Sequence, residues 1–211
     1  MIDHYDWAGG REAMLRFGPA TGPVVVAALP LFEEANRTRA FIVTILRALA
    51  ERGIAGALPD LPGQGESLLQ THAATLAGLR AGFTAACTRF DTAYAFAVRS
   101  GALLDTRAEV AGRCHLVPTT GAELARELGR LRGLHDGNNY AGNLLSPTLL
   151  AELEQAVPAA ARTIRFEGDA RAADLKLRGA PLWRRAEPDN DPALATLLAD
   201  DIGAWVRACE A

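Results

Sequence analysis

Apolar positions along this chain fall into two recurring patterns. Short continuous runs, such as residues 24–29 and 93–98, have the composition of strands that are buried on both faces of a sheet. Longer segments between these runs repeat apolar residues every three or four positions, as amphipathic helices do. The alternation of the two patterns predicts strands and helices in turn along the chain.

Each expected element has a recognisable beginning or end. Gly53 is in the place of a left-handed helix stop, and Thr120 with Glu123 fits a capping box. Ser146 and Asp191, each followed by proline, are expected to begin helices. Strands are expected at residues 14–17, 24–29, 54–58, 93–98, 114–117, 163–166 and 180–184. One helix is expected to end near residue 51, a second to begin near residue 71 and a third to follow residue 101. Three more are expected to begin at residues 120, 146 and 191.

This order predicts an α/β fold, a doubly wound, mostly parallel sheet with helices on both faces. We expect a single domain over residues 1–211, with residues 133–160 as a candidate small lid. Ligands of such sheets bind beyond the carboxyl ends of the strands. The loops expected to share that rim are 30–37, 59–67, 99–101 and 117–121.

Composition narrows the classes of function. The chain has 211 residues, 49% of them hydrophobic, and a net charge of −3, so it can bury a large core and is not basic enough for a nucleic-acid partner. No apolar run reaches the roughly 18 residues of a membrane span, and no apolar signal segment opens the sequence. Its 3 cysteines lack metal-binding spacing, and its 4 histidines are spread singly. We expect reduced thiols, a cytoplasmic protein, and neither metal nor cofactor.

A corner at residues 97–101 carries the most pointed chemical signal. An apolar strand pattern ends there and small residues follow, as in the G-x-S-x-G elbow on which some hydrolases hold their nucleophile. The small flanking residues Ala97 and Gly101 are present, but the central residue is Arg99. Ser100 lies one position later. The sequence therefore predicts a guanidinium where the attacking oxygen is expected.

Two loops and this corner resemble the α/β-hydrolase superfamily. The signature D-x-x-G-x-G-x-S of this superfamily is matched by Asp60, Gly63, Gly65 and Ser67. The loop 30–37, with the sequence PLFEEANR, is in the place of its oxyanion loop. More narrowly, that loop, the arginine-bearing elbow and the segment AGNLLSP at residues 141–147 resemble hydrolases associated with the bacterial exosortase system, which accompany exopolysaccharide and protein-sorting loci. The resemblance covers most of the chain and implies the hydrolase fold and acyl-ester or related hydrolysis.

The chain departs from that superfamily at the catalytic residues. The superfamily needs a serine, then an acid, then a histidine, in this order along the chain. Asp169 or Asp174 is in the expected place of the acid, but no histidine follows His135. Without an imidazole, a serine hydroxyl is a weak nucleophile at neutral pH. We therefore expect a hydrolase-like protein that is degenerate at its catalytic centre.

Three functions are consistent with this pattern. In the first, an anionic or acyl small molecule binds at Arg99, near the start of the following helix, beside Phe32, Glu33, Glu34 and Gly101. The competing interpretation of the same residues is that Glu33 or Glu34 neutralises Arg99 as an internal ion pair.

The second function is an active esterase or thioesterase. Ser100 would be its nucleophile, with His135 reaching in from the lid and Asp169 orienting the imidazole. The third is a partner-binding scaffold that uses the lid or exposed tryptophans, with Trp7 and Trp183 as candidates. We expect no metal in any of the three, and the sequence leaves substrate, partner and oligomeric state open.

Overall fold

A computed structural model describes residues 1–132 and 137–211, which contain an eight-stranded sheet in the order β1-β2-β4-β3-β5-β6-β9-β10. The hairpin β1–β2 and the pair β2–β4 are antiparallel, and the remaining neighbours are parallel. The strands are β1 Ile2–Trp7, β2 Gly10–Phe17, β3 Val24–Ala28, β4 Ala55–Pro59, β5 Ala93–Val98, β6 Gly112–Leu116, β9 Arg162–Phe166 and β10 Leu175–Leu177. The predicted doubly wound, mostly parallel sheet is thus confirmed.

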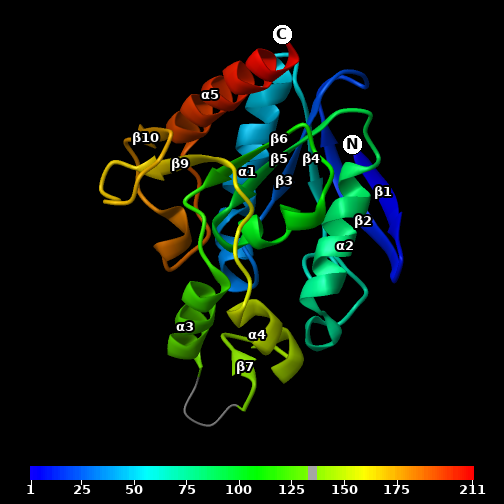
Figure 1. Ribbon diagram of the computed structural model, residues 1–211, viewed down its shortest axis with the longest axis vertical. Helices are drawn as coiled ribbons and strands as arrows, with labels where there is room; N and C mark the ends of the chain where they lie inside the picture. The colour runs from blue at the N-terminus through cyan, green and yellow to red at the C-terminus, as the bar shows by residue number, and fades with distance from the viewer. Residues whose placement is uncertain (133–136) are drawn as a thin grey trace.

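Helices cover both faces of this sheet. They are α1 Glu33–Glu51, α2 Leu76–Cys87, α3 Gly121–Leu131, α4 Pro147–Glu154 and α5 Pro192–Glu210. A two-stranded hairpin, β7 Asn139–Tyr140 and β8 Asn143–Leu144, precedes α4. Figure 1 shows α3, α4 and β7 grouped at the end of the molecule farthest from the C-terminus. We call α3, α4 and the β7–β8 hairpin the cap. No helix in the described ranges has the length and apolarity that crossing a membrane requires.

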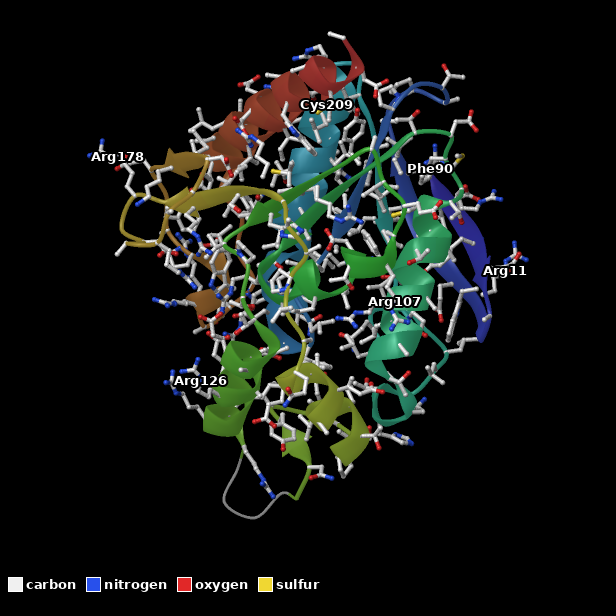
Figure 2. The ribbon with its side chains drawn as sticks, in the orientation of Figure 1. Arg11, Phe90, Arg107, Arg126, Arg178 and Cys209 are labelled. Carbon is white, nitrogen blue, oxygen red and sulfur yellow. The ribbon has the colours of Figure 1, made fainter. Side chains whose placement is uncertain are left out.

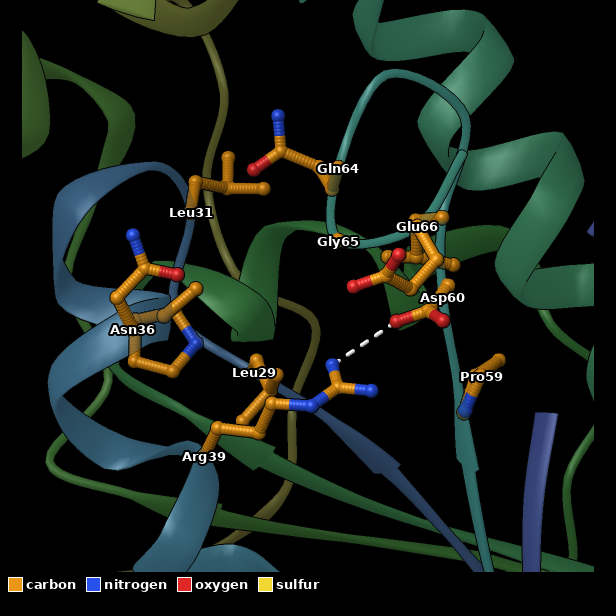
Figure 3. Close-up of a pocket in the computed structure, with 12 residues that line it drawn as sticks. Leu29, Leu31, Asn36, Arg39, Pro59, Asp60, Gln64, Gly65 and Glu66 are labelled. Carbon is orange, nitrogen blue, oxygen red and sulfur yellow. Dashed lines mark hydrogen bonds and ion pairs between the residues drawn. The ribbon is translucent and has the colours of Figure 1, made fainter. Parts of the chain in front are cut away.

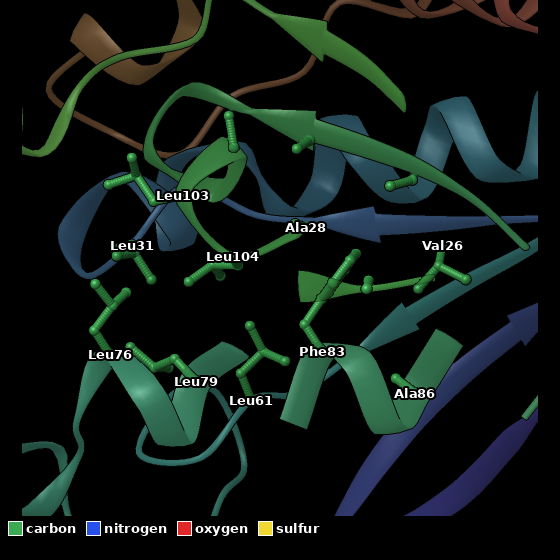
Figure 4. Close-up of a cluster of buried hydrophobic side chains, with 14 of the residues drawn as sticks. Val26, Ala28, Leu31, Leu61, Leu76, Leu79, Phe83, Ala86, Leu103 and Leu104 are labelled. Atoms are coloured by element: carbon green, nitrogen blue, oxygen red, sulfur yellow. The ribbon is translucent and has the colours of Figure 1, made fainter. Parts of the chain in front are cut away.

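The core has two parts, one on each face of the sheet, because successive side chains of a strand point to opposite faces. Val24, Val26 and Ala28 of β3 join the cluster that contains residues of α2 and the cap. Val25 and Ala27 of the same strand join the cluster formed with α1 and α5. Figure 4 shows side chains of α2 reaching toward the sheet in the first cluster.

The local signals that begin and end helices are confirmed. Gly53 has φ +77, the left-handed conformation expected after α1. Thr120 and Glu123 form the predicted capping box at α3, and the side chains of Ser146 and Asp191 accept hydrogen bonds at the starts of α4 and α5. These contacts satisfy amides that have no partner within the helix.

The strand predicted at residues 180–184 is wrong. The last strand is β10, which pairs in parallel with β9 so that Leu175 lies opposite Ile164. Pro181 has no amide hydrogen to donate to a ladder, and the segment Leu182–Arg184 instead forms the 3₁₀ turn η4. Leu182 and Trp183 are buried in the α1–α5 core, which explains why this stretch has the apolar composition of a strand.

The helix predicted after the corner is also wrong. Two 3₁₀ turns, η2 Arg99–Leu103 and η3 Asp105–Arg107, take its place. The Asp105 side chain is completely buried and hydrogen-bonds to His115 of β6 at 2.7 Å. This contact holds the chain against β6 before a regular helix develops.

Candidate functional site

Backbone strain is concentrated at the carboxyl ends of the central strands. Three non-glycine residues there have positive φ: Phe32 at 60 in the loop after β3, Arg99 at 54 after β5 and Val117 at 47 after β6. Bulky residues rarely adopt this conformation, and the strain persists only where the surrounding structure enforces it. Strained residues of this kind cluster at functional sites. Arg99 directly follows β5 and is the strained residue at the apex of the elbow.

Ser100 points away from that apex. The residue is 1% exposed, and its Oγ accepts a hydrogen bond from the Leu31 amide at 2.9 Å. The next amide, that of Phe32, donates to Gln64 Oε1 at 3.1 Å. The α/β-hydrolases that the sequence resembles use an amide from this loop to bind the oxyanion. In this chain the protein's own oxygen atoms occupy both amides.

The Arg99 guanidinium bonds to two carboxylates. Its Nε and Nη2 lie 3.3 and 3.4 Å from the Glu34 carboxylate, and Nη2 also lies 2.8 Å from both carboxylate oxygens of Glu127 on α3. The Arg99 side chain is only 7% exposed, and the guanidinium lies 5.3 Å from the centre of the Trp183 ring. Glu33 pairs with Arg37 instead. An internal ion pair to one of the two adjacent glutamates is thus present, and Glu34 makes it.

Burial raises the pKa of Glu34 above its usual value, although Arg99 opposes the effect. The second carboxylate, that of Glu127, raises the pKa further because like charges repel. One guanidinium bonded to two carboxylates leaves this group of three side chains with a net negative charge when all are ionised. Arg99 is consequently held in place and already paired.

Two cavities meet at Arg99. The first has a volume of about 430 Å³ and an apolar wall that includes Val117, Phe166 and Trp183. The second, of about 410 Å³, is lined by charged residues of α3, including Glu127. Both cavities also include Arg171 and Arg184 in their linings. Figure 2 shows Arg126, a further residue of the second cavity, on α3 of the cap. The arrangement suits an anion with an apolar body.

Asp169 lies in the loop after β9, where the acid was expected, and two arginines hold it. Arg171 Nη2 donates to its carboxylate at 2.9 Å, and Arg165 Nη1 donates at 2.8 Å. These bonds, above all those from Arg171, hold the pKa of Asp169 well below its usual range. Arg171 also reaches Glu123 at 3.3 Å and so ties the loop to α3. Asp174, the other candidate acid, accepts a hydrogen bond from the Thr163 amide.

The histidine expected as the partner of Ser100 is His135. His135 lies outside the described residues. The His115 side chain bonds to Asp105 beneath the elbow and is 1% exposed. In the described part of the chain, the hydrogen bond of the Ser100 hydroxyl is to the Leu31 amide.

Three expectations about the rim need correction. Trp183 is 4% exposed and packs between Arg99 and Phe166, so it is not an exposed tryptophan; Trp7 is half-buried. Gly101 packs against the backbone at the end of β3, so closely that a Cβ there would lie 2.5 Å from the Leu29 carbonyl oxygen. The helix start that was expected to assist Arg99 is a 3₁₀ turn too short to have a large dipole. The cationic groups at this rim are therefore guanidinium groups.

Phe32 belongs to a neighbouring hollow. It lines a cavity of about 290 Å³ together with Gln64 and Asn143. A further cavity, of about 160 Å³, lies between the starts of the loops after β3 and β4. Figure 3 shows its Arg39 side chain directed at Asp60, at 2.9 Å. Asp60 is buried, so this ion pair joins α1 to the loop after β4.

Glu127, Gln64 and Arg171 were missed by reasoning from the sequence. Glu127 lies on a polar helix face and is 28 positions from Arg99, so nothing local marks it as a partner. Gln64 occupies a variable position of the D-x-x-G-x-G-x-S signature, and Arg171 follows Asp169 in a polar loop. Their roles appear only when the strands' carboxyl ends are brought to one rim.

No protein-family model and no curated protein matches the sequence. Solved structures do match. Est1E from Butyrivibrio proteoclasticus, solved with ferulic acid bound, has a TM-score of 0.67 at 15% identity over 98% of both chains. A putative hydrolase from Agrobacterium vitis S4 has a TM-score of 0.60 at 11% identity, over 99% of this chain and 97% of that one. A thermophilic esterase from Thermogutta terrifontis has a TM-score of 0.58 at 12% identity over 100% of both chains. The strand order and these similarities together show that the chain has the α/β-hydrolase fold.

Proposed function

We propose that this chain is a hydrolase-fold protein without the usual serine mechanism, and that it binds an anionic small molecule through Arg99. The observation that carries the proposal is the place of Arg99. It occupies the strained apex with φ 54, while the following Ser100 hydroxyl bonds to the loop amide of Leu31. A guanidinium presents donors in a fork that matches carboxylate and phosphate oxygens. It has no lone pair with which to attack an ester.

The surroundings of Arg99 also support binding. Arginines converge on the two cavities although the whole chain has a net charge of −3. Arg99, Arg171 and Arg184 line both cavities, and Arg126 and Arg130 line the charged one, so they outnumber the lining carboxylates of Asp169, Glu123 and Glu127. Such convergence raises the local concentration of anions. The acid expected for a triad, Asp169, is engaged by two arginines.

Two measurements test this proposal. Wild-type protein should not hydrolyse short p-nitrophenyl esters and should not be labelled by a fluorophosphonate probe. Esterase activity that disappears in Ser100→Ala would overturn the proposal. Binding is measured by calorimetry with benzoate, hexanoate and inorganic phosphate as probes.

Arg99→Met should weaken the binding of the tightest-binding probe by about tenfold or more in Kd, which corresponds to about 1.4 kcal/mol. The double variant Arg99→Met/Glu34→Gln removes the buried carboxylate as well and guards against misfolding. Arg11→Met is the matched control, because the Arg11 side chain is 66% exposed on the β1–β2 hairpin. Equal affinities in wild type and Arg99→Met would contradict the proposal.

The narrower grouping is also a proposal. The residues PLFEEANR, the arginine-bearing elbow and AGNLLSP support placing the chain with hydrolases of exosortase and exopolysaccharide loci. The position of its gene tests this grouping, since it should lie beside genes for an exosortase or for exopolysaccharide synthesis.

A further inference from the structure

We infer that the Glu127 carboxylate occupies the place of a ligand carboxylate on Arg99, and that the ligand displaces it. The site is the one proposed above to bind anions, and the inference rests on that proposal. The ligand class that follows is a carboxylate attached to a compact apolar body.

The two carboxylates on Arg99 differ in how firmly they are held. Glu34 lies in the first turn of α1 and its side chain is 19% exposed. Glu127 comes from the cap, and its side chain is 38% exposed although both of its oxygens lie 2.8 Å from Arg99 Nη2. An exposed carboxylate returns to water readily, whereas a buried guanidinium needs a continuous partner. Glu127 is therefore the exchangeable partner and Glu34 the permanent one.

The cap provides a place for the released carboxylate. Arg130 follows Glu127 by three residues on α3, a spacing at which side chains of a helix meet. Both residues line the charged cavity, and no salt bridge within the described residues engages Arg130. A rotation of the Glu127 side chain toward Arg130 would free Arg99 Nη2 without unfolding α3.

The adjoining cavity indicates what the ligand carries besides its carboxylate. Val117, Phe166 and Trp183 form an apolar wall within a space of about 430 Å³, and Arg99 lines both this space and the charged cavity that contains Glu127. A ligand whose carboxylate replaces that of Glu127 can place an apolar body against this wall. An inorganic anion gains only the first of these contacts.

Calorimetric titration with 3-phenylpropionate tests the displacement in wild type and in Glu127→Gln. The amide keeps the shape of the side chain and removes its charge, so it competes poorly for Arg99. The variant should bind the probe at least about fivefold more tightly, which corresponds to about 1 kcal/mol of binding free energy. The neutral amide 3-phenylpropionamide should bind neither protein measurably, and acetate should bind more weakly than the probe.

Glu123→Gln is the matched control, because Glu123 lines the same cavity on the same helix but pairs with Arg171. Its effect should stay below about twofold, since Arg171 keeps its hydrogen bonds to Asp169 and the potential of the cavity changes only slightly. Equal gains in both variants, or no gain in Glu127→Gln while Arg99→Met still abolishes binding, would overturn the displacement and leave anion binding at Arg99 standing. Absence of binding in wild type and in Glu127→Gln alike would remove the proposed function itself.

Discussion

The hydroxyl of Ser100 and the amide of Leu31 form a hydrogen bond of 2.9 Å beneath the elbow, in a place closed to solvent. The serine that follows the apex thus fastens the elbow to the loop after β3. Its oxygen is an acceptor with a structural partner, and no described histidine is bonded to it.

Ser100→Ala should reduce the free energy of unfolding by about 1–2 kcal/mol, because the buried Leu31 amide then has no acceptor. Chemical denaturation measures this change. Thr196→Ala is the control: its hydroxyl bonds within α5 at an exposed position, and the change should stay within about 0.5 kcal/mol. An unchanged stability for Ser100→Ala would mean that this hydrogen bond does not hold the elbow.

Gly101→Ala should destabilise the protein much more. A Cβ at Gly101 would meet the Leu29 and Ala28 carbonyl oxygens at 2.5 and 2.6 Å, so the backbone of the elbow or of β3 must move. We expect a loss of about 3 kcal/mol or more in denaturant titrations, in the range of severe overpacking.

Gly129→Ala provides the opposite case. Apart from the helix around it, no atom of the described residues lies within 4 Å of a Cβ built at Gly129, which is an exposed position inside α3. Alanine is the better helix former, so this variant should gain up to about 1 kcal/mol. Equal effects of the two substitutions would contradict the packing described at the elbow.

Asp169→Asn should remove a part of the stability that depends on pH. The hydrogen bonds from Arg171, with help from Arg165, hold the pKa of Asp169 below its usual range. A carboxylate with a depressed pKa in the folded state contributes stability above its unfolded pKa of about 4, and that contribution is lost as the pH falls toward the folded value. Wild type should therefore exceed Asp169→Asn by about 2 kcal/mol at neutral pH.

This difference should shrink as the pH falls below about 4, which urea titrations at several pH values measure. Asp6→Asn serves as control, because the Asp6 side chain is 84% exposed and its pair with Arg11 should contribute little at any pH. A constant difference between wild type and Asp169→Asn across the acidic range would contradict the assigned role.

The thiols should react at very different rates. Burial raises the pKa of both Cys87 and Cys114 to about 12, so neither forms an appreciable thiolate near about pH 8. Cys209 is exposed near the end of α5, as Figure 2 shows. A chromogenic disulfide reagent should modify Cys209 quickly in native protein and all 3 cysteines after unfolding. Cys209→Ser should abolish the fast phase, and fast labelling that survives this substitution would contradict the burial of the other two.

Much of the fold was determined by local sequence. The runs around Val25 and Phe96 have the length and composition of strands buried on both faces, and the capping box at Thr120 marks where α3 begins. The elbow with Arg99 at its apex could also be predicted from the sequence, because a strand pattern followed by small residues indicates a tight turn whatever residue lies at its apex. Each of these features depends on neighbours within one turn or one strand.

The second carboxylate on Arg99 and the burial of Trp183 were decided by tertiary structure alone. Glu127 contacts Arg99 only because α3 lies beside the elbow, and Trp183 is buried only because the segment after β10 packs on α1 rather than forming a strand. A carboxylate on a helix face or a tryptophan in a loop has the same local pattern whether it meets water or a guanidinium. The sequence therefore determined which cation lies at the apex and that one of two adjacent glutamates pairs with it. Packing between distant segments determined that Glu127 pairs with it as well.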